Sequence, residues 1–118
     1  MLIMPLLKLE TTVLISEDQR KALLASLFKI VAETMGKPEQ YVMITVGQAS
    51  MLMSGSPRAA AFVDVRSIGG LTGDVNRKLS QQVCKLLNDS LGVPGNRVYL
   101  NLTDVAASNW GWNGSTFG

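Results

Sequence analysis

The 118 residues are 47% hydrophobic and 17% charged, a balance that excludes a disordered chain and suits one domain, residues 1–118, with its own core. The net charge is +2 and no basic run exceeds two residues, so we expect no nucleic-acid partner, and no apolar stretch is long enough for a membrane span. Histidine is absent and cysteine occurs once, which excludes a disulfide framework and a Ser–His or Cys–His pair and argues against a metal site.

The N-terminal segment is a poor signal peptide. Its apolar run lacks a preceding positive region and is interrupted at Lys8. We therefore expect a cytoplasmic protein, for which any secretion would follow an unconventional route. Residues 1–4 are treated as an extension, and the first strand is predicted at 5–11.

A helix is predicted after this strand. Ser16 is a good N-cap, and the two acidic residues that follow it suit the positive end of the helix dipole. Apolar residues then recur at helical spacing as far as Met35. Gly36 ends the helix, with Pro38 just beyond it. A second strand is predicted at 41–48.

The second half of the chain repeats this order at a constant spacing of 56 residues, without gaps. The helix cap Ser16 matches Thr72, and the helix end Gly36 matches Gly92. Apolar positions of the helices and strands match as well. The two repeats span 5–48 and 59–103, and the second one contains the predicted strands 59–67 and 97–103.

Two strand–helix–strand units predict an α/β (α+β) fold. Each unit forms a right-handed parallel crossover, so the pair gives a four-stranded mixed sheet with both helices on one face. Several strands are nearly continuous apolar runs, typical of strands buried on both faces. Because the helices leave one face bare, a second copy of the chain is its simplest cover. The C-terminal tail, 104–118, is too short for its own core and should lie on another element.

Four motifs in this order, distributed over the doubled frame, carry a resemblance to a known family. They are Gly36-Lys37-Pro38-Glu39-Gln40-Tyr41, Ser67-Ile68-Gly69, Asn96-Arg97-Val98-Tyr99-Leu100-Asn101 and Gly111-Trp112-Asn113-Gly114-Ser115-Thr116-Phe117. From Pro5 to its end, the chain resembles the macrophage migration inhibitory factor and D-dopachrome tautomerase family of the tautomerase superfamily. The resemblance implies a homotrimer whose sheets line a central barrel, with active sites between adjacent subunits and no cofactor.

The resemblance also implies a keto–enol tautomerase. Its substrates would be phenylpyruvate-like α-keto acids or dopachrome-like compounds, and an N-terminal proline would act as the general base. Pro5 matches that base. Lys37 matches the lysine beside the substrate's carboxylate or carbonyl, and Ile68 matches the residue whose backbone N–H donates to the same region.

The remaining implied site residues bind and enclose the substrate. Tyr99 and Asn101 match the pair that a neighbouring subunit supplies. The residues that match the aromatic rim of the pocket are Tyr41, Trp112 and Phe117.

An α-amine suits this chemistry in a chain without histidine. A base that removes a proton next to a carbonyl works best with a pKa near the working pH, and a free α-amine has a pKa of about 8. Burial and a nearby Lys37 cation would both lower that pKa. Pro5 has such an amine only when nothing precedes it. We therefore predict that residues 1–4 must be absent from the active form.

Other interpretations remain open. The chain is alternatively a cytokine-like signalling protein with a vestigial pocket, although no residue indicates a receptor. A ferredoxin-like regulatory or RNA-recognition module would share the coarse strand order, but its aromatic and basic platform is missing. Taken singly, Pro5 would be an ordinary strand-edge proline and Lys37 an ordinary cation after a helix end.

Overall fold

The computed structural model describes residues 3–36 and 39–118. No helix in these two ranges is long and apolar enough to cross a membrane. The main elements are β1 (Met4–Thr11), α1 (Glu17–Met35), β2 (Met43–Gln48), β3 (Ala61–Ile68), α2 (Gly73–Leu91) and β4 (Val98–Asp104). The short elements are the 3₁₀ turns η1 (Glu39–Tyr41), η2 (Gly95–Arg97) and η3 (Ala107–Asn109) and the two strands β5 (Gly111–Trp112) and β6 (Ser115–Thr116).

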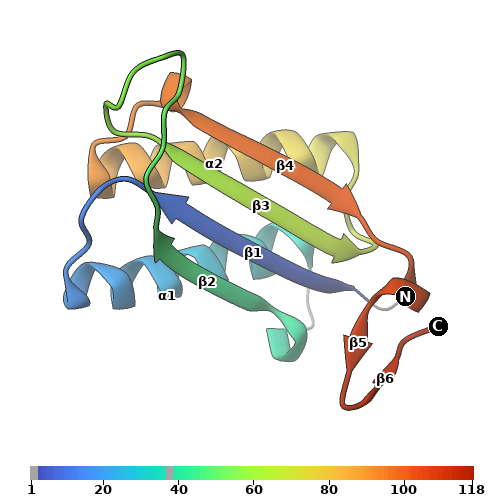
Figure 1. The fold of residues 1–118 in the computed structure, drawn as a ribbon. Coiled ribbons are helices and arrows are strands. Elements are labelled where there is room, and N and C mark those ends of the chain that lie inside the picture. The colour runs from blue at the N-terminus through green and yellow to red at the C-terminus, as the bar shows by residue number, and fades with distance from the viewer. Residues whose placement is uncertain (1–2, 37–38) are drawn as a thin grey trace.

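The sheet has the predicted mixed topology. Its strand order is β2-β1-β3-β4, with β1 parallel to β2, β3 parallel to β4, and β1 antiparallel to β3. Both helices lie on the same face of the sheet (Figure 1). The predicted fold class is therefore confirmed. Strands β2 and β4 are the outer strands, so among residues 3–36 and 39–118 each has one edge without a partner strand.

Both helices begin and end where the sequence predicts. The Ser16 hydroxyl accepts a hydrogen bond from the Gln19 N–H, and the Gln19 side chain accepts one from the Ser16 N–H, which forms a capping box. The Thr72 hydroxyl accepts from the Val75 N–H at the start of α2. Gly92 ends α2 with a φ of 69°, a left-handed conformation that glycine adopts at little cost.

The core lies between the sheet and the helices. Alternate residues of the two central strands point toward the helices, and the apolar stripes of α1 and α2 pack on them. Burial of each large aliphatic side chain contributes about 1.5–3 kcal/mol. The largest aliphatic side chains with no exposed surface are Leu7, Leu9, Val63, Val65, Leu27, Val31, Leu79, Val83, Leu87 and Val93.

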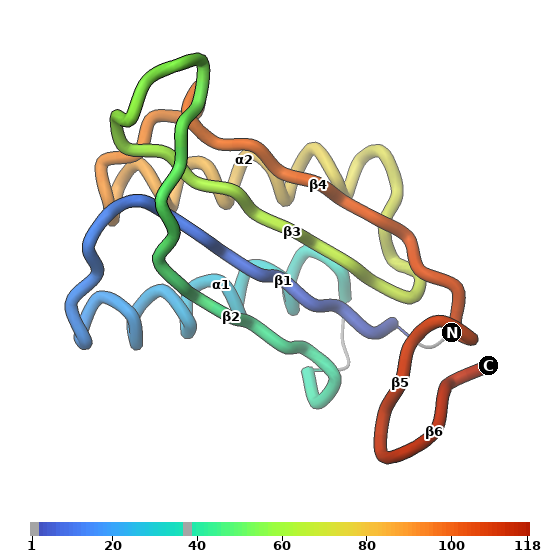
Figure 2. The backbone as a smooth tube through the Cα atoms, viewed as in Figure 1, coloured from blue at the N-terminus to red at the C-terminus, as the bar shows by residue number. Residues whose placement is uncertain are grey.

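The repeat gives the molecule a pseudo-twofold arrangement. Because β1 and β3 are antiparallel, equivalent positions of the two repeats lie at opposite ends of the sheet. The loop 49–60 follows β2 at one end, and the tail 105–118 follows β4 at the other (Figure 2). At each end of the sheet, the segment that follows an outer strand therefore lies over the ends of the strands.

Three strands begin later than predicted, and β1 begins one residue earlier, at Met4. β3 begins at Ala61 rather than at Ala59, and a 3₁₀ turn precedes each of the other two. β2 begins at Met43 rather than at Tyr41, since the Val42 N–H donates to the Glu39 carbonyl at 3.1 Å. In the same way, η2 occupies the residues before β4, which begins at Val98. The turns direct Tyr41 and Arg97 away from their strands.

The face of the sheet away from the helices is polar at its centre. In register across β1, β3 and β4 lie Lys8, Asp64 and Asn101, and Arg66 also stands on this face. The expectation of strands buried on both faces is therefore not met within one chain. That further copies of the chain cover this face stays a prediction. Such copies would contact charged side chains rather than a bare apolar surface.

Candidate functional site

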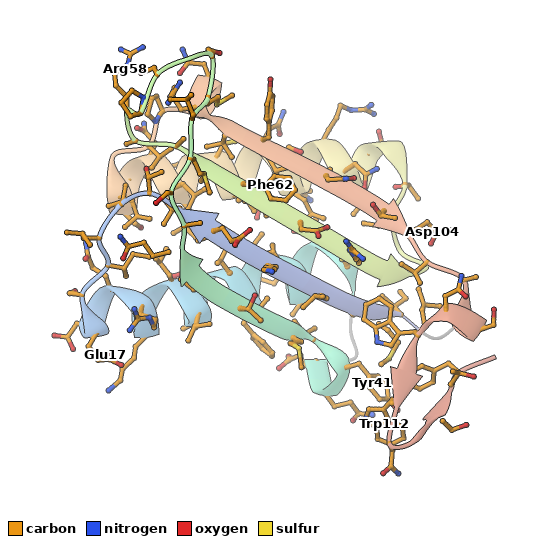
Figure 3. The ribbon with its side chains drawn as sticks, viewed as in Figure 1. Glu17, Tyr41, Arg58, Phe62, Asp104 and Trp112 are labelled. Atoms are coloured by element: carbon orange, nitrogen blue, oxygen red, sulfur yellow. The ribbon has the colours of Figure 1, made fainter. Side chains whose placement is uncertain are left out.

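A pocket of about 440 Å³ lies at the end of the sheet where β1 and β2 begin. It brings together three of the predicted site residues, Pro5, Tyr41 and Trp112. Tyr41 and Trp112 lie close to each other at this end of the molecule (Figure 3). We call it the Pro5 pocket, and its full lining is Met4, Pro5, Leu6, Gln40, Tyr41, Val42, Met43, Trp110, Gly111 and Trp112.

Pro5 is buried as the second residue of β1. Met4 precedes it, is 4% exposed and lies opposite Ile68 in the sheet. The nitrogen of Pro5 is therefore a backbone amide in the 118-residue chain, without a basic lone pair. Removal of residues 1–4 would expose this nitrogen and free the space that Met4 occupies in the pocket wall.

The backbone around Ile68 is fixed by a small polar network. The Ser67 hydroxyl, which is fully buried, donates to the Gly69 carbonyl at 2.6 Å. The Gly69 N–H donates to Asp104 Oδ1 at 3.1 Å. Gly69 and Gly70 have φ values of 72° and 82°, which favour glycine. This geometry explains the Ser-Ile-Gly motif and holds Ile68 beside the position before Pro5.

The tail supplies an aromatic wall. The rings of Trp112 and Phe117 stack with centroids 5.9 Å apart and an interplanar angle of 16°. The Phe117 N–H donates to the Trp110 carbonyl at 3.2 Å, which closes the small β5–β6 hairpin. Trp112 lines the pocket while Phe117 supports it from outside the lining. The tail therefore packs on the start of the first repeat.

Trp110 is a pocket residue that sequence reasoning missed. The resemblance placed Trp112 and Phe117 in the rim and gave Trp110 no role. In the structure, Trp110 and Trp112 both line the Pro5 pocket. Gln40 joins them from η1, and Met43 joins them from the start of β2. The one available signal was a second indole in a tail that cannot form a core by itself.

Tyr99 and Asn101 do not join this pocket within one chain. Both lie on β4, the outer strand on the far side of the sheet from β2. Tyr99 is 66% exposed, and Asn101 Oδ1 accepts a hydrogen bond from the Thr103 hydroxyl at 3.0 Å. Lys37 lies outside the described residues. The predicted roles of these three residues stay predictions.

Tyr99 instead lines a second cavity of about 300 Å³, which we call the loop hollow. Its other walls come from Met51–Ser54 of the loop and from the start of β3. Next to it, Arg97 is only 7% exposed. The Arg97 guanidinium donates to four backbone carbonyls of the loop at 2.7–3.3 Å. The acceptors belong to Met53, Ser56, Arg58 and Ala59.

The remaining reactive side chain, Cys84, is structural. It is half-buried on α2 and packs against the core. Burial raises the pKa of its thiol, which reduces the thiolate that a nucleophile or metal ligand needs. Within residues 3–36 and 39–118, no three His, Cys, Asp or Glu side chains come together as metal ligands would.

Comparison with known proteins gives a consistent result. A family model described as macrophage migration inhibitory factor (MIF) matches residues 4–118. A MIF homologue of Trichuris trichiura is 40% identical over 115 residues, which cover 97% of this chain and all of that protein. The MIF of Meriones unguiculatus is 41% identical over 82% of this chain and 85% of its own length.

Solved structures agree with these relatives. The crystal structure of a MIF homologue from Prochlorococcus marinus superposes with a TM-score of 0.90 at 39% identity, over 96% of this chain and 99% of that one. A MIF-like protein from Entamoeba histolytica has a TM-score of 0.91 at 34% identity, over 96% and 98% of the two chains.

Proposed function

The chain belongs to the macrophage migration inhibitory factor family, and from this premise we propose that it is a keto–enol tautomerase whose base is Pro5. Its substrates are α-keto acids such as phenylpyruvate, or dopachrome-like compounds. The observation that carries the proposal is the position of Pro5 in the wall of a pocket enclosed by Tyr41 and two indoles. Such a pocket accepts a flat aromatic substrate and limits the access of water.

The active form begins at Pro5, where the nitrogen is a secondary amine. The amine takes a proton from the carbon next to the substrate's keto group, and the electrons of that C–H bond form the enol double bond. The carbonyl oxygen gains the negative charge and is then protonated to give the enol. The apolar walls of the pocket favour the neutral amine, which is the form that can accept a proton.

The developing oxyanion needs donors. We assign this role to the Ile68 N–H and to Lys37, which the family resemblance implies. The Ser67–Gly69–Asp104 network supports the assignment, because it fixes the backbone on which Ile68 lies. Fixed donors stabilise a developing charge without reorganising during the reaction.

We further propose a homotrimer in which the site is completed by a neighbour. Tyr99 and Asn101 are exposed and stand on the outer strand far from their own Pro5 pocket. This position suits side chains that reach the pocket of an adjacent subunit. Leu52, 72% exposed beside Tyr99 in the loop hollow, adds apolar surface suited to such a contact.

The test compares the 118-residue chain with a chain that begins at Pro5, each verified by intact mass. We expect the shorter chain to convert phenylpyruvate at least about 10³-fold faster, within the range that general-base catalysis contributes. In the shorter chain, Pro5→Gly should remove most of this activity, while Pro57→Ala in the exposed loop serves as the matched control. Equal turnover by the two chain lengths would contradict the Pro5 mechanism.

A folded trimer without turnover in either form would favour the signalling interpretation instead. A biological effect that survives Pro5→Gly would have the same meaning.

A further inference from the structure

A third cavity, of about 250 Å³, adjoins the Pro5 pocket on the open face of the sheet. The two cavities share three wall residues, Leu6, Trp110 and Gly111. Trp110 therefore stands between them and belongs to both. We call the third cavity the Arg66 hollow, and its lining is Leu6, Arg66, Val105, Asn109, Trp110 and Gly111. None of these lining residues is acidic.

Arg66 is held at this hollow by the sheet. It lies directly opposite Leu6 in the pairing of β1 with β3, one step along the strand from Pro5. Its Nε donates to Asp64 Oδ1 at 3.3 Å and to Oδ2 at 3.2 Å, and its Nη2 lies 3.1 Å from Oδ2. Asp64 thereby orients the guanidinium from one side.

The guanidinium retains donors for a ligand. The contacts with Asp64 use Nε and Nη2, so among the described residues the Nη1 donors have no partner. The Arg66 side chain is 57% exposed, whereas that of Asp64 is 17% exposed. The cation therefore faces the open space more than its counter-ion does. A planar guanidinium with free donors matches the two oxygens of a carboxylate.

We propose that Arg66 and Trp110 form a distal subsite that selects substrates with a second anionic group. This inference rests on the proposed tautomerase function and specifies its substrate class. The keto-acid end occupies the Pro5 pocket, and an aromatic or apolar body lies along the Trp110 indole. A distal carboxylate reaches Arg66. The preferred substrates are thus dicarboxylic α-keto acids and their enols, rather than acids with an uncharged far end.

The experiment measures a selectivity ratio with the chain that begins at Pro5. The ratio is kcat/KM for 4-carboxyphenylpyruvate divided by kcat/KM for phenylpyruvate. We expect Arg66→Gln to lower this ratio about fivefold, which corresponds to the free energy that a partly exposed ion pair contributes. Arg66→Lys should retain part of the selectivity. The matched control is Arg58→Gln, which removes the same charge at the opposite end of the molecule (Figure 3).

A second readout separates this inference from the proposed function. Calorimetric titration of the 118-residue chain with the same two acids measures their affinity ratio without any turnover. If neither chain length is active, an affinity ratio that falls with Arg66→Gln still supports the subsite.

Three results would overturn the subsite. The first is a selectivity ratio that Arg66→Gln leaves unchanged, and the second is an equal fall of that ratio with Arg58→Gln. The third is a change in oligomer size with Arg66→Gln, which would assign the side chain to assembly.

Discussion

The two ends of the sheet are built from equivalent positions, yet one carries a pocket with aromatic walls and the other carries a loop that an arginine holds in place. At the spacing of 56 residues, the wall residues Met4, Pro5, Leu6 and Met43 of the Pro5 pocket correspond to Ala60, Ala61, Phe62 and Tyr99 of the loop hollow. The repeat therefore provides the same concavity twice. What differs is the segment that covers each one.

The contrast depends largely on one pair of equivalent positions, Tyr41 and Arg97. Tyr41 forms a wall of the Pro5 pocket and leaves the space beside it open. Arg97 extends into the loop, and its guanidinium donates to four loop carbonyls, of which those of Met53 and Ser56 also accept from a backbone N–H. A single long cationic side chain thus fixes the loop beside one concavity, while an aromatic ring at the equivalent position forms a wall of the other.

The largest effect should come from removing the contacts between Arg97 and the loop. Arg97→Met removes a donor from four partly buried carbonyls, two of which keep a backbone partner, and we expect the free energy of unfolding to fall by about 2–4 kcal/mol. Urea denaturation measures this loss. Tyr41→Phe at the equivalent position is the control and should cost less than about 0.5 kcal/mol. Similar losses of unfolding free energy for Arg97→Met and Tyr41→Phe would show that Arg97 does not hold its end of the sheet together more than Tyr41 does.

The next largest effect should come from opening the pocket further. Trp112→Ala removes the indole that stacks on Phe117, and we expect kcat/KM for phenylpyruvate to fall about 10- to 30-fold. The change in folding stability should be small, because Trp112 is 58% exposed. Steady-state kinetics on the chain that begins at Pro5 measures the effect. A loss of stability without a loss of kcat/KM would make this aromatic pair structural.

A smaller effect concerns the segment before Pro5. A Cβ at Gly70 would lie 3.1 Å from Ile3 Cγ2 and 3.1 Å from Met35 Cε, at a φ of 82°. Gly70→Ala should therefore destabilise the 118-residue chain by about 1–2 kcal/mol. The cost should be smaller in the chain that begins at Pro5, where Ile3 is gone. Thermal unfolding of both chain lengths provides the comparison, and an equal cost would place the strain elsewhere.

The smallest effect on stability should come from Cys84, whose Cβ lies near Gly95 in η2, the turn that contains Arg97. Burial raises the pKa of its thiol, so the folded chain holds this proton more tightly than the unfolded chain does. The stability that Cys84 contributes is therefore complete below the unfolded pKa and is lost as pH rises through the folded one. Cys84→Ser should flatten the alkaline decline slightly. Iodoacetamide should alkylate the folded thiol a few-fold more slowly than the unfolded one, and equal rates would contradict its burial.

The sequence predicted the fold well because the decisive signals were local. Helix caps, helical periodicity and the spacing of 56 residues all act within one repeat, and the structure confirms the helices and the mixed sheet. The strand starts were less accurate, since the propensities of Tyr41 and Arg97 do not reveal the turns that contain them.

The site was less predictable because its walls come from distant segments. Family resemblance identified Pro5, Tyr41 and Trp112, which the structure brings together. Trp110 was missed, since its position depends on how the tail folds back on the sheet. Arg97 was expected only as a strand residue. A buried arginine whose partners are carbonyls nearly forty residues away in sequence leaves no local pattern.

The unpaired outer edges of β2 and β4 carry a consequence for handling the protein. In the part of the chain that the structure describes, each outer edge is a row of backbone groups that no strand pairs, and such rows join readily to other strands. Conditions that separate the subunits of the proposed trimer at high protein concentration should thus promote fibrous precipitates while helix content persists. Additives that bind extended backbone would then preserve the material better than additives that strengthen the core.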